Sequence, residues 1–141
     1  MERALALYPN NKIVWAHMGI SYEQKSLDAS EHITILSRLL DQYPNLMIDI
    51  SWRVLEDYYF SKFGNRSKYV AFMNRYSDRI LPGSDFVAFR GNNFKVYQSE
   101  LEATSRILQY IDNDAFRNIA LGENYFQLLN LEYQAPAICQ S

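Results

Sequence analysis

The chain has few of the residues that hold disulfide frameworks or metal clusters together. Its 141 residues include one cysteine, Cys139, and two histidines, His17 and His32. A single cysteine excludes a disulfide framework within one chain. We therefore expect the fold to depend on an apolar core.

Long apolar runs and basic runs are also missing. No run approaches the roughly 18–20 apolar residues that span a bilayer. The opening "MERALALYPN" has neither a long apolar stretch nor a small-residue cleavage site, so it does not look like a secretory signal. Lysine and arginine form no stripe, and the formal net charge is −2, which argues against a nucleic-acid partner. We expect a cytoplasmic protein that binds neither membrane nor nucleic acid.

Glycine is scarce too, with five residues in all. The segment "HMGISYEQ", which follows the first predicted strand, lacks the repeated glycines of the dinucleotide-binding fingerprint. The sequence therefore disfavours nucleotide binding, and with it the doubly wound α/β fold as an alternative architecture.

What the sequence does contain is the composition of a globular protein. Apolar residues make up 48% of the chain and aromatic residues 15%, enough for a packed core. The length predicts one domain, which we place at 1–131. The tail at 132–141 shows no periodicity, and we expect it to be loose.

Three short β-rich runs, 12–17, 45–51 and 79–85, are continuous rather than alternating. That pattern is typical of strands buried on both faces, as in parallel sheets. The first two runs each follow a Tyr-Pro-Asn turn. We expect helices at 30–43, with Ser30 as the N-cap, at 52–60 and 68–76, with a break around Gly64 and Asn65, and at 97–111, 113–120 and 122–131. This alternation predicts an α/β fold with parallel strands.

Polar residues gather at the carboxyl ends of the predicted strands, where α/β folds place their chemistry. They are His17, Asp49, Ser51, Ser84 and Asp85. An isolated charge in apolar surroundings is strongly penalised, so Asp85, beside Phe86 and Val87, is either an exposed loop acid or a working group.

His17 and Asp85 are the candidate catalytic and metal-binding pair. Imidazole and carboxylate together can bind a divalent metal, or act as acid and base around a metal-bound water. The alternatives are a histidine satisfied by a backbone carbonyl and an aspartate that caps a turn. Catalytic zinc usually takes three protein ligands. We expect His32 to be a surface residue rather than the third ligand.

Four segments together resemble the last part of the amidohydrolase-related family of metal-dependent TIM-barrel enzymes. They are "NKIVWAHMG", "YPNLMIDISW", "DRILPGSDF" and "IALGENYFQLLNL", which span roughly 12–131. The family has a histidine after the sixth barrel strand, a Tyr-Pro-Asn-Leu turn before the seventh, Gly-Ser-Asp after the eighth, and a closing helix near Gly-x-Asn. The resemblance implies that the chain is the C-terminal portion of a (β/α)8 barrel, holding its sixth to eighth strands.

By the same resemblance, Asp85 is a metal ligand and the proton acceptor for the attacking water. His17 is implied to be a general acid/base or substrate contact, and in some members a metal ligand. The implied cofactor is a divalent metal ion, zinc in most members. The implied reaction is hydrolysis of a small-molecule amide, ester or lactone, or the related decarboxylation of an aromatic acid.

The first-strand His-x-His pair of that family is absent from this sequence, and about three of the eight units are present. We therefore expect the chain to need N-terminal barrel units, or to form a homo-oligomer through open sheet edges. The alternative is a non-catalytic remnant or an interaction protein without a complete metal site.

Three further residues are candidates for substrate binding. Trp52 and Arg53 follow the second predicted strand, and the Arg53 guanidinium could bind a carboxylate; otherwise they simply begin the next helix. Arg90 lies in the loop after Asp85, where barrels place substrate loops, and is otherwise an ordinary loop arginine.

Overall fold

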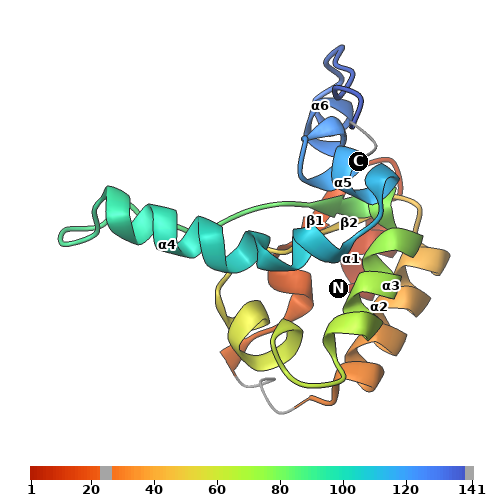
Figure 1. Cartoon of the computed structure of the whole chain (residues 1–141). Helices are drawn as coiled ribbons and strands as arrows, with labels where there is room; N and C mark the ends of the chain where they lie inside the picture. Colours follow the sequence, from red (N-terminus) through yellow and green to blue (C-terminus); the bar gives the residue numbers. More distant parts are fainter. Residues whose placement is uncertain (23–26, 139–141) are drawn as a thin grey trace.

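The structure, a computed structural model, describes residues 1–22 and 27–138 (Figure 1). Its elements are α1 (Glu2–Leu7), β1 (Ile13–Trp15), η1 (Ala16–Gly19), α2 (Ala29–Gln42), β2 (Leu46–Asp49), η3 (Glu56–Phe60), α3 (Arg66–Arg75), η4 (Ser77–Arg79), β3 (Ile80–Leu81), α4 (Phe94–Ser105), η5 (Arg106–Tyr110), α5 (Asn113–Ile119) and α6 (Glu123–Leu128).

The three strands form one parallel sheet in the order β1-β2-β3. Val14 pairs with Met47, and Ile48 pairs with Ile80. The predicted α/β fold with parallel strands is confirmed, although each strand is shorter than its apolar run. The last paired residues of the three strands are Trp15, Asp49 and Leu81. The polar residues predicted at the strand ends lie at or just beyond these positions.

One face of the sheet packs against α2 and α3 to form the core. Leu46, Ile48 and Ile50 alternate along β2 and its continuation and are fully buried. They belong to one apolar cluster with Leu36 of α2 and Met73 of α3. Alternate strand residues point to opposite faces, so Met47 and Asp49 point to the other side of the sheet.

The two Tyr-Pro-Asn turns are tied together by one side chain. The Asn45 amide nitrogen donates to the carbonyls of Tyr8 (3.0 Å) and Asn11 (3.1 Å). In addition, the half-buried Arg79 guanidinium donates from its Nε to the Leu46 carbonyl (2.7 Å). These bonds fix the starts of β1 and β2 side by side.

Two expectations about α2 are wrong. Its N-cap is Asp28 rather than Ser30, because the Asp28 carboxylate accepts from the Ser30 amide (2.8 Å). His32 is not a surface residue, since it is only 3% exposed. It lies one turn before Leu36 on the apolar face of the helix, where its two ring nitrogens bind Tyr69 Oη and the Met18 carbonyl, both at 2.8 Å.

The free edge of β3 is covered by α6. The Leu81 carbonyl accepts from the Ile50 amide, so the Ile80 and Pro82 carbonyls point away from β2. The Asn124 amide nitrogen donates to the Ile80 carbonyl (2.6 Å) and the Tyr125 hydroxyl donates to the Pro82 carbonyl (2.7 Å). Of the two sheet edges that we expected to be open, this one is therefore occupied by side chains.

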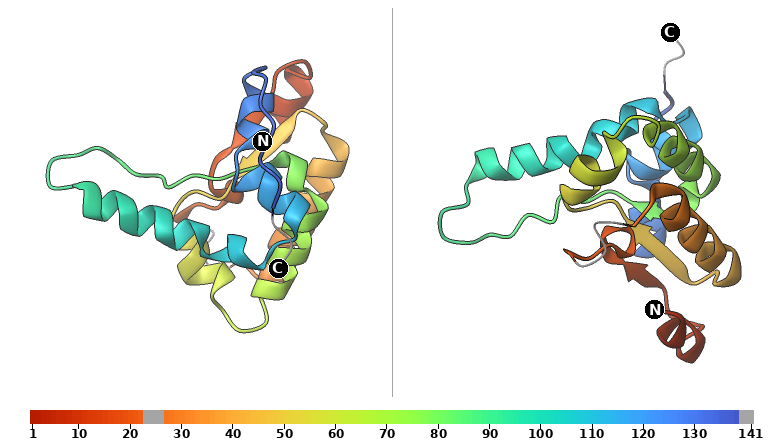
Figure 2. Two further views of the ribbon diagram at one scale, coloured as in Figure 1. Left: turned by 45° about the horizontal axis from the view of Figure 1, so that its top comes forward. Right: turned by 90° about the horizontal axis from the view of Figure 1, so that it is seen from below.

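A long projection leaves the body of the molecule after β3 (Figures 1 and 2). We call residues 82–105 the arm: an extended segment leads outward to a tip near residue 90, and α4 returns from it. Ala103 is already fully buried near the base of the arm.

The tail after α6 forms no helix or strand up to residue 138, but it is held at two points. The Tyr133 ring stacks on Phe126 at 4.1 Å, and the Ala135 amide donates to Glu123 Oε1 (3.0 Å). Cys139 lies outside the described residues.

Candidate functional site

Each strand is followed by a residue with an unusual backbone conformation. His17 (φ 57°), Trp52 (φ 76°) and Asp85 (φ 56°) all adopt the left-handed region, which is uncommon for residues other than glycine. Such conformations need support from surrounding structure and are often found at functional sites. Here they turn three side chains around the carboxyl edge of the sheet.

The left-handed turns bring three of the predicted residues to one pocket. His17, Trp52 and Asp85 line an open pocket of about 520 Å³, together with Ile20, Ser21 and Tyr22. The Trp52 ring lies 5.2 Å from the His17 ring. The edge of the sheet thus holds an imidazole, a carboxylate and an aromatic surface around one space, with Asp85 exposed and His17 half-buried.

A series of hydrogen bonds to Ser51 and Asp49 supports His17 from the neighbouring strand. His17 Nδ1 lies 2.9 Å from Ser51 Oγ. Asp49 Oδ1 accepts from the Ser51 hydroxyl (2.5 Å), the Ser51 amide (3.1 Å) and the His17 amide (2.9 Å). Asp49 therefore binds both the backbone of His17 and the side chain that holds its ring.

The hydrogen bonds from His17 to Ser51 and from Ser51 to Asp49 fix the tautomer of neutral His17. The Ser51 hydroxyl has one proton, and it donates that proton to Asp49, so Ser51 Oγ can only accept from His17. Nδ1 must then carry the proton of the neutral imidazole, which leaves the lone pair on Nε2. A histidine in this state can accept a proton or bind a metal through Nε2.

Two glycines allow the strand ends to approach closely. A Cβ at Gly83 would lie 2.8 Å from the Ser51 Cβ, so the loop after β3 can touch Ser51 only where there is no side chain. A Cβ at Gly19, where φ is +72°, would lie 2.5 Å from the Trp15 ring. Both glycines are needed for the compact edge around His17.

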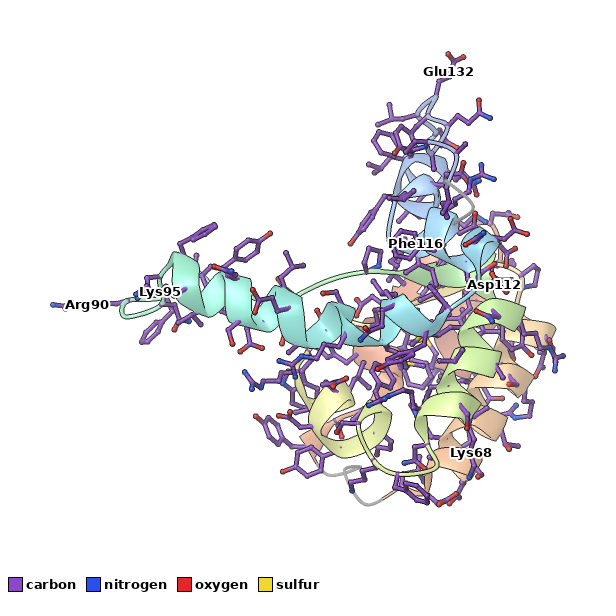
Figure 3. All side chains as sticks on the ribbon, viewed as in Figure 1. Lys68, Arg90, Lys95, Asp112, Phe116 and Glu132 are labelled. Carbon is purple, nitrogen blue, oxygen red and sulfur yellow. The ribbon has the colours of Figure 1, made fainter. Side chains whose placement is uncertain are left out.

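The two candidate arginines do not join His17 at its pocket. Arg53 lines an adjoining pocket of about 420 Å³, which Trp52 and Asp85 also border. Its guanidinium is paired with Asp57 (3.4 Å) and Glu100 (4.0 Å) and donates to Ser99 Oγ (3.2 Å). Arg90 lies at the tip of the arm, far from the strand ends (Figure 3).

The described residues supply only part of a metal-binding site. His17 and Asp85 border the same space, but within the described part of the chain no three His, Cys, Asp or Glu side chains gather closely enough to bind a metal ion together. Asp49 Oδ1 is already occupied by three donors. Of the described residues, His17 and Asp85 are therefore the two candidate ligands at this pocket, and the remaining ligands of a catalytic zinc would have to come from elsewhere.

Sequence reasoning placed Asp49 and Ser51 at this edge but gave them no role. Their spacing could have indicated a role. An aspartate two residues before a serine can accept from the serine amide and hydroxyl in an Asx turn. Sequence reasoning did not predict that Tyr125 lies near Asp49 at this edge. Burial raises the pKa of its hydroxyl, and the nearby negative charge of Asp49 adds to the shift.

The fold and the site define an α/β chain with polar groups converging at the carboxyl edge of a parallel sheet. Comparison with protein-family models, with curated proteins and with solved structures found no match to this chain. Among the described residues, no helix is long and apolar enough to cross a lipid bilayer.

Proposed function

We propose that this chain carries the C-terminal strands of a metal-dependent hydrolase of the amidohydrolase type, built as a (β/α)8 barrel. The observation that carries the proposal is the placement of His17 and Asp85 on one pocket at the carboxyl ends of β1 and β3. This is the edge at which barrel enzymes place their catalytic residues.

The proposed roles of the residues follow from their positions and hydrogen bonds. A divalent metal ion, which Asp85 and His17 would help to hold, would lower the pKa of its bound water to about 7. The exposed Asp85 carboxylate accepts a proton at the pocket. His17 presents the lone pair of Nε2, either as a ligand of the metal ion or as an acid/base group toward the substrate, and Asp49 orients its ring through Ser51.

The substrate we propose is a small amide, ester or lactone, or an aromatic acid that loses its carboxylate. Trp52 provides an aromatic surface beside His17. Arg53 can bind a substrate carboxylate only by exchanging its present partners, Asp57 and Glu100.

Metal binding by the purified chain tests the proposal. We expect Zn²⁺, titrated against a chromophoric chelator at pH 7.5, to bind in a way that needs both side chains. Asp85→Asn and His17→Gln should each weaken binding about tenfold or more, because each removes one of two ligands. All variants should carry Cys139→Ser, since a free thiolate binds zinc by itself.

Asp114→Asn is the matched control, because Asp114 is an exposed carboxylate in the first turn of α5, away from the pocket. It should bind zinc as the parent does. Equal binding in the parent, Asp85→Asn and His17→Gln would contradict the proposal.

The alternative is a non-catalytic interaction protein. One observation favours it: within the described residues, the chain has two pocket ligands and no group of three. Under this alternative the three proteins in the zinc titration do not differ, and the pocket residues serve only to shape the sheet edge.

A further inference from the structure

The arm presents an apolar flank and a charged flank of α4 to solvent. We propose that the arm is a dimerisation surface, on which α4 packs antiparallel against α4 of a second copy of this chain. This inference is independent of the hydrolase proposal. It depends on the apolar side chains of the arm and on the order of charges along α4.

The arm carries five exposed large apolar side chains. Phe94 is 73% exposed, and Tyr97 and Leu101 are also exposed. At 3.6 residues per turn, positions 94, 97 and 101 lie on one side of the helix. On the outgoing segment Val87 and Phe89 are exposed as well. A group of exposed apolar side chains on one projection is a candidate interaction site.

The charged side chains of α4 occupy a neighbouring flank of the helix. Lys95 and Glu102 are exposed and lie two turns apart, so they share one flank. Glu102 Oε1 accepts from Gln98 on the same helix (2.7 Å). The flank that faces the body is different: Ala103 is buried there, and Val96 and Glu100 border the pocket near Arg53. Figure 3 shows Lys95 on the outer part of the arm.

An antiparallel pair related by a two-fold axis satisfies both flanks at once. In such a pair the same flank of each helix meets its counterpart, and residue i contacts j of the partner while j contacts i. Centred between Gln98 and Ser99, the pairing places Lys95 opposite Glu102 of the second copy, and vice versa. The apolar positions 94, 97 and 101 then interdigitate with those of the second copy. A parallel two-fold pair would instead leave the charged flanks of the two helices on opposite sides of the pair, so neither Lys95 nor Glu102 would meet a charged partner.

The size of the surface predicts a weak, reversible dimer. The helix has 12 residues and is therefore about 18 Å long. Its contact with a second arm falls below the roughly 800 Å² per partner of a standard stable interface. We therefore expect a dissociation constant in the range of about 1–100 μM that increases with ionic strength, since the charge pairs are exposed.

Sedimentation equilibrium of the full chain, at concentrations from about 5 to 300 μM, tests the proposal. Lys95→Glu and Glu102→Lys should each weaken dimerisation about tenfold, because attraction becomes repulsion at both symmetric pairs. The double variant Lys95→Glu/Glu102→Lys should restore the dimer, since it exchanges the charges without changing the pairing. Leu101→Asp should abolish it.

Lys68→Glu is the matched control, because Lys68 lies on α3 far from the arm (Figure 3); its dimerisation should be unchanged. Circular dichroism confirms that each variant is folded. A chain that stays monomeric at every concentration would overturn the proposal and leave the arm to contact other parts of a larger protein. A dimer insensitive to Leu101→Asp, or one that the double variant fails to restore, would overturn it equally.

Discussion

The two histidines of the chain are held in opposite tautomers. In His17, Nδ1 donates to Ser51 Oγ. In His32, Nε2 donates to the Met18 carbonyl, and Nδ1 accepts from the Tyr69 hydroxyl. His32 thereby holds the left-handed turn at 17–19 that orients His17, so the buried histidine supports the half-buried one.

Ser51→Ala is expected to change the tautomer of His17 without unfolding the protein. The variant removes the acceptor that selects Nδ1–H, while the Asp49 carboxylate still accepts from the His17 amide. Nitrogen-15 chemical shifts of the imidazole rings distinguish the tautomers. His32 provides the internal control, because its partners are untouched. Unchanged His17 shifts would show that Ser51 does not select the tautomer.

His32 should make the stability of the fold depend on pH. Burial lowers the pKa of His32 below its ordinary value of about 6.5, although the bond to the Met18 carbonyl opposes the shift. Below about pH 6.5 the unfolded state binds a proton that the folded state excludes. The stabilisation is therefore complete above the unfolded pKa and is lost as pH falls towards the folded one, by up to about 1.4 kcal/mol per pH unit.

Urea unfolding at pH 7.5 and 5.5 measures this contribution. The parent should lose more free energy of unfolding across this range than His32→Gln, whose side chain cannot titrate. The same loss in both proteins would assign the pH dependence to other groups.

At the scale of elements, the sequence predicted the types and the order of the helices and strands better than the residues at which they end. Continuous apolar runs identified the three parallel strands, and the break at Gly64 and Asn65 correctly separated η3 from α3. The strands end before the left-handed residues His17, Trp52 and Asp85, whose backbone conformations no local pattern revealed. His32 was assigned to the surface because it lies beside Ser30 and Glu31, although its spacing to Leu36 places it on the apolar face of α2.

The side chains that cover β3 should limit association through the sheet. Tyr125→Phe removes the donor to the Pro82 carbonyl at the free edge of β3, and Asn124→Leu removes the donor to Ile80. An exposed strand edge pairs readily with other chains. We expect both variants to increase light scattering on mild heating, with Asn124→Leu also lowering the free energy of unfolding by about 1–3 kcal/mol.

Tyr133→Phe is the control, because it loses a similar hydroxyl-to-carbonyl bond, to Leu121, away from the sheet edge. It should lose comparable stability to Tyr125→Phe without increased scattering. Equal scattering in the two tyrosine variants would show that the edge is not what the Tyr125 hydroxyl protects.

For the molecule as a whole, the sequence indicated where the candidate site lies but not how its parts are joined. Strand order alone places His17 and Asp85 at one edge, since parallel strands share their carboxyl ends. The bond from His17 to Ser51 depends on the register of β1 against β2 and on the contact between Gly83 and Ser51. The outward course of the arm depends on tertiary packing at Ala103, which the helical periodicity of α4 does not encode.

The position of α6 also has a kinetic consequence. Because Asn124 and Tyr125 occupy the outward carbonyls of β3, any strand that pairs with this edge must exchange places with a helix. Once the incoming strand is abundant, the rate of such an exchange reaches a plateau set by how often α6 detaches. Joining further strands to this sheet is then a slow, first-order rearrangement rather than a simple bimolecular encounter.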